Sequence, residues 1–264
     1  MSWFHAVAEA DAPGRSGEAR GLEGEVIATV GAFAAHPTTV SAGDGITHAD
    51  WPGVFAAAVE ERFGGVAMNV PTGLGDTSTR GGTQMGAALA ELVPDVGAGI
   101  VVDDPTIRVA AERWEHPVTN TVLGALATPG FFDRPFNPTP AQVSVGTHDA
   151  ARCTSASAIS VTTQVSAARI GSLVITGAPG ETFSNLSNTI KEANPNGVTL
   201  PLGMTNDGLG YLMQSFESDF AARQGLGFGA QDAGFEYEEA YSIDECIGDA
   251  ALETTLRLLD ELGG

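Results

Sequence analysis

The chain has 264 residues, 43% of them hydrophobic, which is enough to form one sizeable core. Its charge is unusual, because 33 Asp and Glu against 12 Lys and Arg give a formal net charge of −21 at pH 7. Such a field disfavours nucleic acid and anionic membranes as partners, and no apolar run is long enough for an integral membrane segment. Since the acids are spread along the chain, we interpret them as the solvated surface of a halophilic protein, with a cationic partner as the alternative.

The chain ends and the cysteines give weaker indications. Residues 1–22 predict a poorly ordered lead-in, and residues 23–264 predict a single α/β domain. The N-terminus lacks the basic and apolar regions of a signal peptide, so the chain as written is expected to be cytoplasmic; export of a longer gene product stays open. Cys153 and Cys246 show no metal-ligand spacing, and we expect two unlinked, mostly buried thiols.

The first half of the chain alternates between strand and helix patterns. Residues 24–33 predict a strand that ends before His36-Pro37, because proline stops a strand. A helix from Pro52 to about Phe63 is ended by Gly64-Gly65. A second strand over 65–70 leads into a glycine-rich turn, Gly73–Gly82, and a helix over 84–93 follows.

The second half continues this alternation. We expect a short strand over 99–102 and a mostly helical segment over 107–126 with a break at Pro117. Further strands are predicted over 142–147, 158–170, 171–177 and 198–202, and helices over 183–193, capped by Ser184 or Thr182, and 249–262. The fold class is therefore α/β, with a layered mixed β-sheet and flanking helices.

Polar side chains follow several of these strands. The turn Gly73–Gly82 is expected to expose backbone N–H groups and Ser78, which could be a nucleophile, a phosphate-loop hydroxyl or a helix cap. His36 and Glu181 also stand at strand ends, so we expect them to converge with Ser78. Each residue also has a structural interpretation: a structural histidine for His36, a first-turn acid for Glu181 and an anchoring aromatic for Tyr211.

The order of the motifs narrows these interpretations. The sequence contains AAHPTT, ADWPGVFAAAVEERFGG, GLGDTSTRGG, GAPGETFSNLSNTIK and NDGLGYLM in this order. This series resembles the neutral/alkaline (non-lysosomal) ceramidase family in its short prokaryotic form, over roughly residues 22–262. The resemblance implies a partial ceramidase-like catalytic domain and a zinc amidohydrolase of sphingolipid metabolism. Such an enzyme cleaves N-acyl-sphingosine into a sphingoid base and a fatty acid.

The resemblance also implies roles for individual residues. His36 matches a zinc-ligating histidine, Glu181 a zinc-ligating glutamate, and Tyr211 the tyrosine that completes the metal sphere. Ser78 matches a serine that acts as nucleophile or as a hydrogen bonder to the reacting amide. An imidazole, a carboxylate and a phenolate suit a Lewis-acidic Zn²⁺ with an open water position.

One departure from the family bears on activity. Family members carry a further zinc ligand in an upstream H-T-H motif, and this sequence has no His-x-His. We therefore expect the C-terminal part of a ceramidase-like domain without an immunoglobulin-like domain, with an upstream-encoded half or a homo-oligomer as partner. The substrate would be an N-acylated lipid or another amide. The alternatives are a catalytically inactive remnant or binding protein without a competent metal site, and a phosphate-binding protein that uses the Gly73–Gly82 turn.

Overall fold

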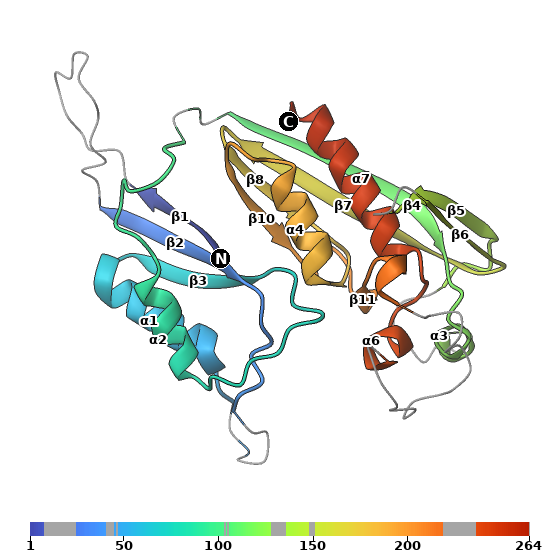
Figure 1. Cartoon of the computed structure of the whole chain (residues 1–264), viewed down its shortest axis with the longest axis horizontal. Coiled ribbons are helices and arrows are strands. Elements are labelled where there is room, and N and C mark those ends of the chain that lie inside the picture. The colour runs from blue at the N-terminus through green and yellow to red at the C-terminus, as the bar shows by residue number, and fades with distance from the viewer. Residues whose placement is uncertain are drawn as a thin grey trace. The chain divides into compact units, whose positions relative to one another are not determined.

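The computed structural model describes residues 1–7, 25–40, 45, 47–102, 104, 106–127, 136–147, 151–218 and 236–263 (Figure 1). The chain divides into two compact units. Unit 1 comprises Met1–Pro71 and Ser78–Asp103, and unit 2 comprises Thr72–Thr77 and Asp104–Gly264. That residues 23–264 form one domain stays a prediction. No helix in the described ranges is long and apolar enough to cross a membrane.

Unit 1 is a three-stranded sheet with two helices on one face (Figure 1). The sheet order is β1–β2–β3, with β1 (Ser2–Val7) antiparallel and β3 (Val66–Pro71) parallel to β2 (Val26–Phe33). Helices α1 (Asp50–Phe63) and α2 (Gln84–Glu91) supply most of the buried core. They approach closely at Gly86, where a Cβ atom would lie 2.1 Å from the carbonyl oxygen of Trp51.

Strand β1 corrects the prediction of a poorly ordered lead-in over residues 1–22. Residues 2–7 pair with β2 in register, and His5 lies between Thr29 and Pro94. The segment gave little periodicity because its six side chains are all half-buried rather than alternately buried and exposed. The remainder of the predicted lead-in, residues 8–22, lies outside the described ranges.

Unit 2 is built around a four-stranded mixed sheet. Its order is β10 (Val198–Leu202), β8 (Leu173–Gly177), β7 (Ser160–Ile170) and β4 (Ile107–Pro117), with β10 parallel to β8 and the other pairs antiparallel. A hairpin, β5 (Ala141–Gly146) with β6 (Arg152–Ser157), and a short parallel pair, β9 (Glu181–Thr182) with β11 (Tyr211–Leu212), complete the strands. The predicted α/β class with a mixed sheet and flanking helices is confirmed.

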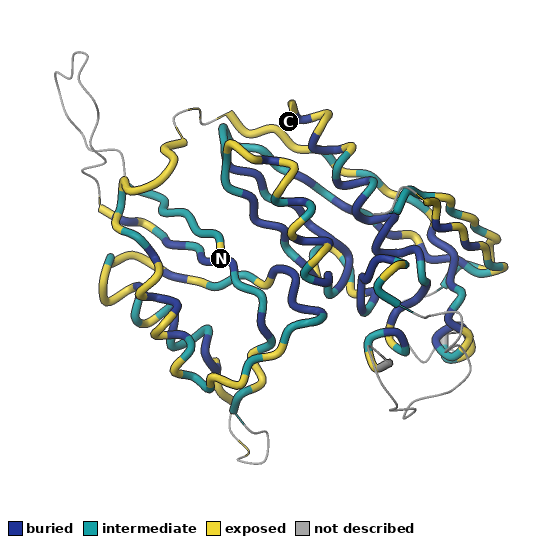
Figure 2. The backbone as a smooth tube through the Cα atoms, viewed as in Figure 1, coloured by how far each residue is buried: buried dark blue, intermediate teal, exposed yellow. Residues whose placement is uncertain are grey.

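Two long helices cover one face of this sheet (Figure 2). Helix α4 (Ser184–Glu192) and helix α7 (Ile247–Glu261) contribute Leu186, Ile190, Ile247 and Leu258 to a core that also contains Val165 and Val174 from the sheet. The shorter helices are α3 (Thr121–Ala127), α6 (Glu236–Ala240) and the 3-10 turn η2 (Ser215–Glu217). The predicted amphipathic terminal helix is thereby confirmed, and its apolar side chains pack into the core of unit 2.

The helix predicted over 107–126 is wrong in its first half. Residues 107–117 form β4, which pairs with β7 along its whole length, and only residues 121–127 are helical. Alternation decides this: Val109 is 74% exposed, whereas Trp114 packs on the core and His116 is fully buried. The Ala- and Arg-rich composition favoured a helix, but pairing across the sheet overrides such weak propensities. The short strand predicted over 99–102 is also wrong, because these residues form an exposed connection.

The cysteines form a disulfide, which corrects the expectation of two unlinked thiols. Cys153 of β6 and Cys246, directly before α7, are joined with their Cα atoms 5.6 Å apart and 93 residues apart in sequence. The residue spacing carried no indication of this bond, because it depends on β6 lying beside the N-terminal end of α7. Both side chains are buried, as expected.

Candidate functional site

Glu181 and Tyr211 lie side by side in unit 2, directly opposite each other in the parallel pair β9–β11. The pair is fixed by two backbone bonds, from the Glu181 N–H to Gly210 (2.8 Å) and from the Phe183 N–H to Leu212 (3.1 Å). Burial and the negative charge of Glu181 raise the pKa of Tyr211 well above its ordinary value.

Two glycines let the strands of this pair approach so closely. A Cβ atom at Gly180 would lie 2.3 Å from the carbonyl oxygen of Gly210. At Gly210 itself φ is +79°, and a Cβ atom would lie 1.8 Å from the carbonyl oxygen of Tyr241. The Pro-Gly turn before Glu181 and the glycine-broken loop before Tyr211 are therefore required for the pairing of β9 with β11.

The glycine-rich turn packs against the same strand. The Gly75 N–H donates to the Thr182 carbonyl at 3.0 Å, and a Cβ atom on Gly75 would lie 2.7 Å from the carbonyl oxygen of Glu181. Asp76, the next residue, accepts hydrogen bonds from the backbone N–H (2.8 Å) and the hydroxyl (2.6 Å) of Ser184. Residues 73–76 are thus part of unit 2 and lie against Glu181 and the first turn of α4.

This contact corrects the predicted cap of α4. Phe183 occupies the N-cap position and provides no side-chain cap, while Ser184 is the first helical residue. The Thr182 hydroxyl is instead paired with the Ser187 hydroxyl at 3.1 Å. The capping oxygen therefore comes from Asp76, 108 residues earlier in the chain.

Ser78 is exposed and belongs to unit 1. It is not the cap of α2, because the N-cap position of that helix is Thr83. The backbone N–H groups of Leu74, Gly75 and Thr77 all donate to carbonyls of the chain, so they are not turned outward as expected. This removes the main support for a phosphate-binding turn, and Asp76 beside it would repel an anion.

His36 follows β2 in unit 1 and is half-buried, between the buried Ala35 and the exposed Pro37. Its carbonyl oxygen accepts the N–H of Thr38 at 3.0 Å, which closes a tight turn. Of the predicted site residues, the structure brings Glu181 and Tyr211 together within unit 2. The convergence of His36 and Ser78 with them involves both units and stays a prediction.

Solved structures with a similar fold were found. No family model and no curated protein matches the sequence. The crystal structure of neutral ceramidase from Pseudomonas aeruginosa matches with a TM-score of 0.55 and 15% identity, covering 90% of this chain and 44% of that chain. A ceramidase complexed with C2 matches with a TM-score of 0.51 and 16% identity, covering 89% of this chain and 45% of that one. This chain has the fold of part of a neutral ceramidase. It spans less than half the length of the ceramidases that it matches.

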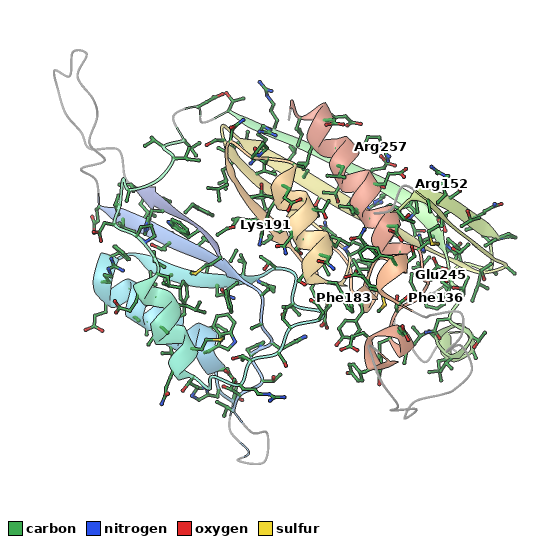
Figure 3. All side chains as sticks on the ribbon, viewed as in Figure 1. Phe136, Arg152, Phe183, Lys191, Glu245 and Arg257 are labelled. Carbon is green, nitrogen blue, oxygen red and sulfur yellow. A yellow bond between two sulfur atoms is a disulfide. The ribbon has the colours of Figure 1, made fainter. Side chains whose placement is uncertain are left out.

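Glu181 and Tyr211 are the residues of unit 2 that would hold the zinc ion implied by the resemblance. The Glu181 carboxylate is an ordinary zinc ligand, and Tyr211, opposite it in the strand pair, would add a phenolate oxygen after losing its proton. A second candidate is less suitable. Among the residues that the structure describes, Cys153, Glu245 and Cys246 place their ligand atoms within 4.8 Å of one another, with Glu245 labelled beside α7 in Figure 3. The two sulfurs are joined in the disulfide, and a thiolate is the form that binds metal.

Two aromatic residues, Phe183 and Tyr237, lie against Tyr211 and were not among the predicted site residues. The centroid of the Tyr237 ring lies 5.8 Å from that of Tyr211 and 4.7 Å from that of Tyr241. The buried Phe183 ring also packs edge-on against Tyr211, with centroids 6.5 Å apart. Tyr237 is 60% exposed, so the stack runs from the core to the surface. No spacing in the sequence links these residues, because α6 follows Tyr211 only after a long connection.

A buried polar network supports the loop that carries Tyr241. The indole N–H of Trp114 donates to Nδ1 of His116 (3.1 Å), so Nε2 carries the imidazole proton and donates to Asp244 (2.9 Å). Burial opposes ionisation of Asp244, but hydrogen bonds from His116 and Thr119 outweigh it and hold the pKa below its ordinary value. The Asp244 carboxylate also accepts hydrogen bonds from the hydroxyls of Thr119 and Ser155. The network therefore fixes the segment around Asp244, just before α7.

Proposed function

We propose that this chain is a zinc-dependent amide hydrolase, and that its substrate is an N-acylated lipid such as N-acyl-sphingosine. The observation that carries the proposal is the placement of Glu181 directly opposite the buried Tyr211 in the parallel pair β9–β11. The sequence resemblance implies that both residues are zinc ligands, and the fold, which is that of part of a neutral ceramidase, supports the proposal.

In this proposal Glu181, Tyr211 and His36 hold the zinc ion. A zinc ion in such a site acts as a Lewis acid and lowers the pKa of bound water. Tyr211 must lose its proton to become a ligand, and both its burial and the charge of Glu181 oppose that loss in the metal-free protein. Ser78 hydrogen-bonds the reacting amide or receives its acyl group. Zinc affinity should therefore rise with pH, because the phenol proton leaves on binding.

The alternative is a binding protein that keeps the fold without a competent metal site. One observation favours it: burial and the negative charge of Glu181 raise the pKa of Tyr211, so the phenol keeps its proton in the metal-free protein. A phenol with a raised pKa resists the deprotonation that metal binding requires.

Zinc content and amide cleavage distinguish the two functions. The protein is purified in high salt, zinc per chain is measured by mass spectrometry, and release of fluorophore from an N-acyl-sphingosine and from a short-chain amide is followed. The assay is repeated with any separately encoded polypeptide that supplies the remainder of a ceramidase domain. Glu181→Gln should abolish both zinc retention and cleavage, whereas Glu192→Gln, on an exposed residue at the end of α4, should change neither.

About one zinc per chain, lost in Glu181→Gln together with amide cleavage, would support the amidase. Zinc and cleavage only with the added polypeptide would support a divided enzyme. Absence of zinc and of cleavage under both conditions would refute the proposal and leave the binding protein.

A further inference from the structure

Asp50 of unit 1 has an unusual conformation for a buried residue. Its side chain is 3% exposed, and its φ angle is +52°, in the region that favours glycine. Two other non-glycine residues among those described, Met204 and Asn206, also have positive φ, but both are exposed. Strained backbone of this kind persists only where the surrounding contacts determine it.

The contacts that hold Asp50 converge on its carboxylate. Oδ2 accepts the backbone N–H groups of Thr39 (2.6 Å) and Val40 (2.9 Å). Oδ1 accepts the Thr39 hydroxyl (2.6 Å) and the Trp51 N–H (2.6 Å). The Asp50 N–H itself donates to Nδ1 of His48 at 2.7 Å. Three of the four donors to the carboxylate thus come from Thr39 and Val40, so capping α1 through Trp51 is the smaller part of its role.

Along the chain, His36 lies three residues after Phe33 and three residues before Thr39. The Phe33 ring packs edge-on against Trp51, with centroids 5.7 Å apart. Trp51 is 1% exposed and stands in the core of unit 1. The consecutive residues Asp50 and Trp51 therefore hold the two ends of the segment that has His36 at its centre, and Pro37 restricts the backbone between them.

We propose that Asp50 is a positioning residue, which fixes the His36 turn so that the imidazole is preorganised for a metal cation. The inference rests on the proposed function for the identity of the cation, but the placement of His36 by Asp50 does not depend on it. All the contacts that carry the inference lie within unit 1. Partners that orient a ligand in this way raise metal affinity because the ligand need not be ordered on binding.

Two variants and one control test the proposal. Asp50→Asn replaces one acceptor oxygen by an N–H₂ group, so it removes at least the bonds made by that oxygen and places donor against donor. Thr39→Val removes one bond of the four and leaves both backbone bonds to Oδ2. Asp95→Asn is the matched control, because Asp95 is in the same unit and its side chain is 83% exposed.

The readout is the imidazole Cε1–Hε1 NMR signal of His36 in the metal-free protein, assigned with His36→Gln. His5 is an internal control for the fold of unit 1, because its ring is held by Thr29 (2.8 Å) and by the carbonyl of Pro94 (3.2 Å). We expect Asp50→Asn to move the His36 signal toward that of a free imidazole and to leave the His5 signal in place. Thr39→Val should move it less, and Asp95→Asn should not move it. In a zinc titration, Asp50→Asn should weaken binding by about 10- to 100-fold.

An unchanged His36 signal in Asp50→Asn would overturn the inference, and so would equal displacement of the His5 and His36 signals, since Asp50 would then only stabilise unit 1. A wild-type protein that binds no zinc would refute the proposed function. The NMR comparison would still decide the role of Asp50 in that case, so the two failures are distinguishable.

Discussion

Removal of the Asp76 carboxylate should destabilise unit 2 by about 2 kcal/mol, because α4 has no other side-chain cap. Asp76 supplies both a cap to the Ser184 N–H and a bond to the Ser184 hydroxyl. Loss of a cap costs about 0.5–2 kcal/mol, and a hydrogen bond to a charged group contributes about 1.5–3 kcal/mol. The two bonds end on one residue and are not additive, which places the expected loss for Asp76→Ala near the middle of this range.

The assay is urea denaturation in high salt, followed by far-ultraviolet circular dichroism. Asp76→Asn keeps one acceptor oxygen and should lose roughly half as much stability as Asp76→Ala, about 1 kcal/mol. Asp104→Ala is the control, since Asp104 is an exposed aspartate of the same unit and bonds only locally, to Thr106. If Asp76→Ala lost no more than Asp104→Ala, Asp76 would not be the cap of α4, and the glycine-rich turn would be held against Glu181 by its backbone alone.

Two further measurements test other features of unit 2. Reduction of the Cys153–Cys246 disulfide opens a loop of 93 residues. From the chain entropy gained by the unfolded state, it should lower the free energy of unfolding by up to about 4.6 kcal/mol. Equal urea midpoints with and without dithiothreitol, or two free thiols in the unreduced protein, would contradict this prediction. Burial, with help from Asp76 and Asp249, raises the pKa of Glu217 above its ordinary 4.5, although bonds from Gln214 and Asn185 oppose this rise. The stability that Glu217 contributes is therefore fully present below pH 4.5 and is lost progressively as pH rises from 4.5 through the higher pKa of the folded protein. The stability deficit of Glu217→Gln relative to wild type should shrink over this pH range. A deficit that stays constant with pH would show that the pKa of this carboxyl is not raised.

The elements of unit 1 that were predicted correctly are those whose ends are set by nearby residues in the sequence. Strand β2 ends at Phe33, four residues before Pro37. Helix α1 ends at Phe63 and is followed by Gly64, whose φ is +75°. The strand, glycine-rich turn and helix around Gly73–Gly82 also follow from local composition. Such elements can be read from sequence because the residues that begin and end them are neighbours along the chain.

The errors arose where distant segments decide the structure. Residues 107–117 have the composition of a helix, and only their pairing with β7 makes them a strand. Cys153 and Cys246 are brought together by β6 and α7, and the cap of α4 comes from Asp76 rather than from Ser184. In each case the deciding partner lies about 40 or more residues away in sequence, beyond the reach of a local pattern.

In the candidate site, too, some residues could be selected from the sequence and others only from the structure. Glu181 and Tyr211 were selected through the resemblance and not through periodicity, and the pairing of their strands depends on the close approach of Gly180 to Gly210. Asp50 gave no indication as a single aspartate before Trp51, because its carboxylate acts on a turn eleven residues earlier. Candidate binding residues can thus be proposed from a motif, whereas a candidate positioning residue such as Asp50 is found only from the structure.

The carboxylates at these turns are held mostly by neutral donors rather than by cations. Asp50 and Asp76 accept from backbone N–H groups and hydroxyls, and Glu115 accepts from two hydroxyls and an amide. A chain with 33 acids and 12 Lys and Arg cannot pair its acids with cations one to one. Salt screens exposed charges beyond about 3 Å at 1 M, but it does not intervene in a direct hydrogen bond to a buried carboxylate such as that of Asp50. If the acidic surface is an adaptation to high salt, the turn that carries His36 is held by contacts that the same salt does not weaken.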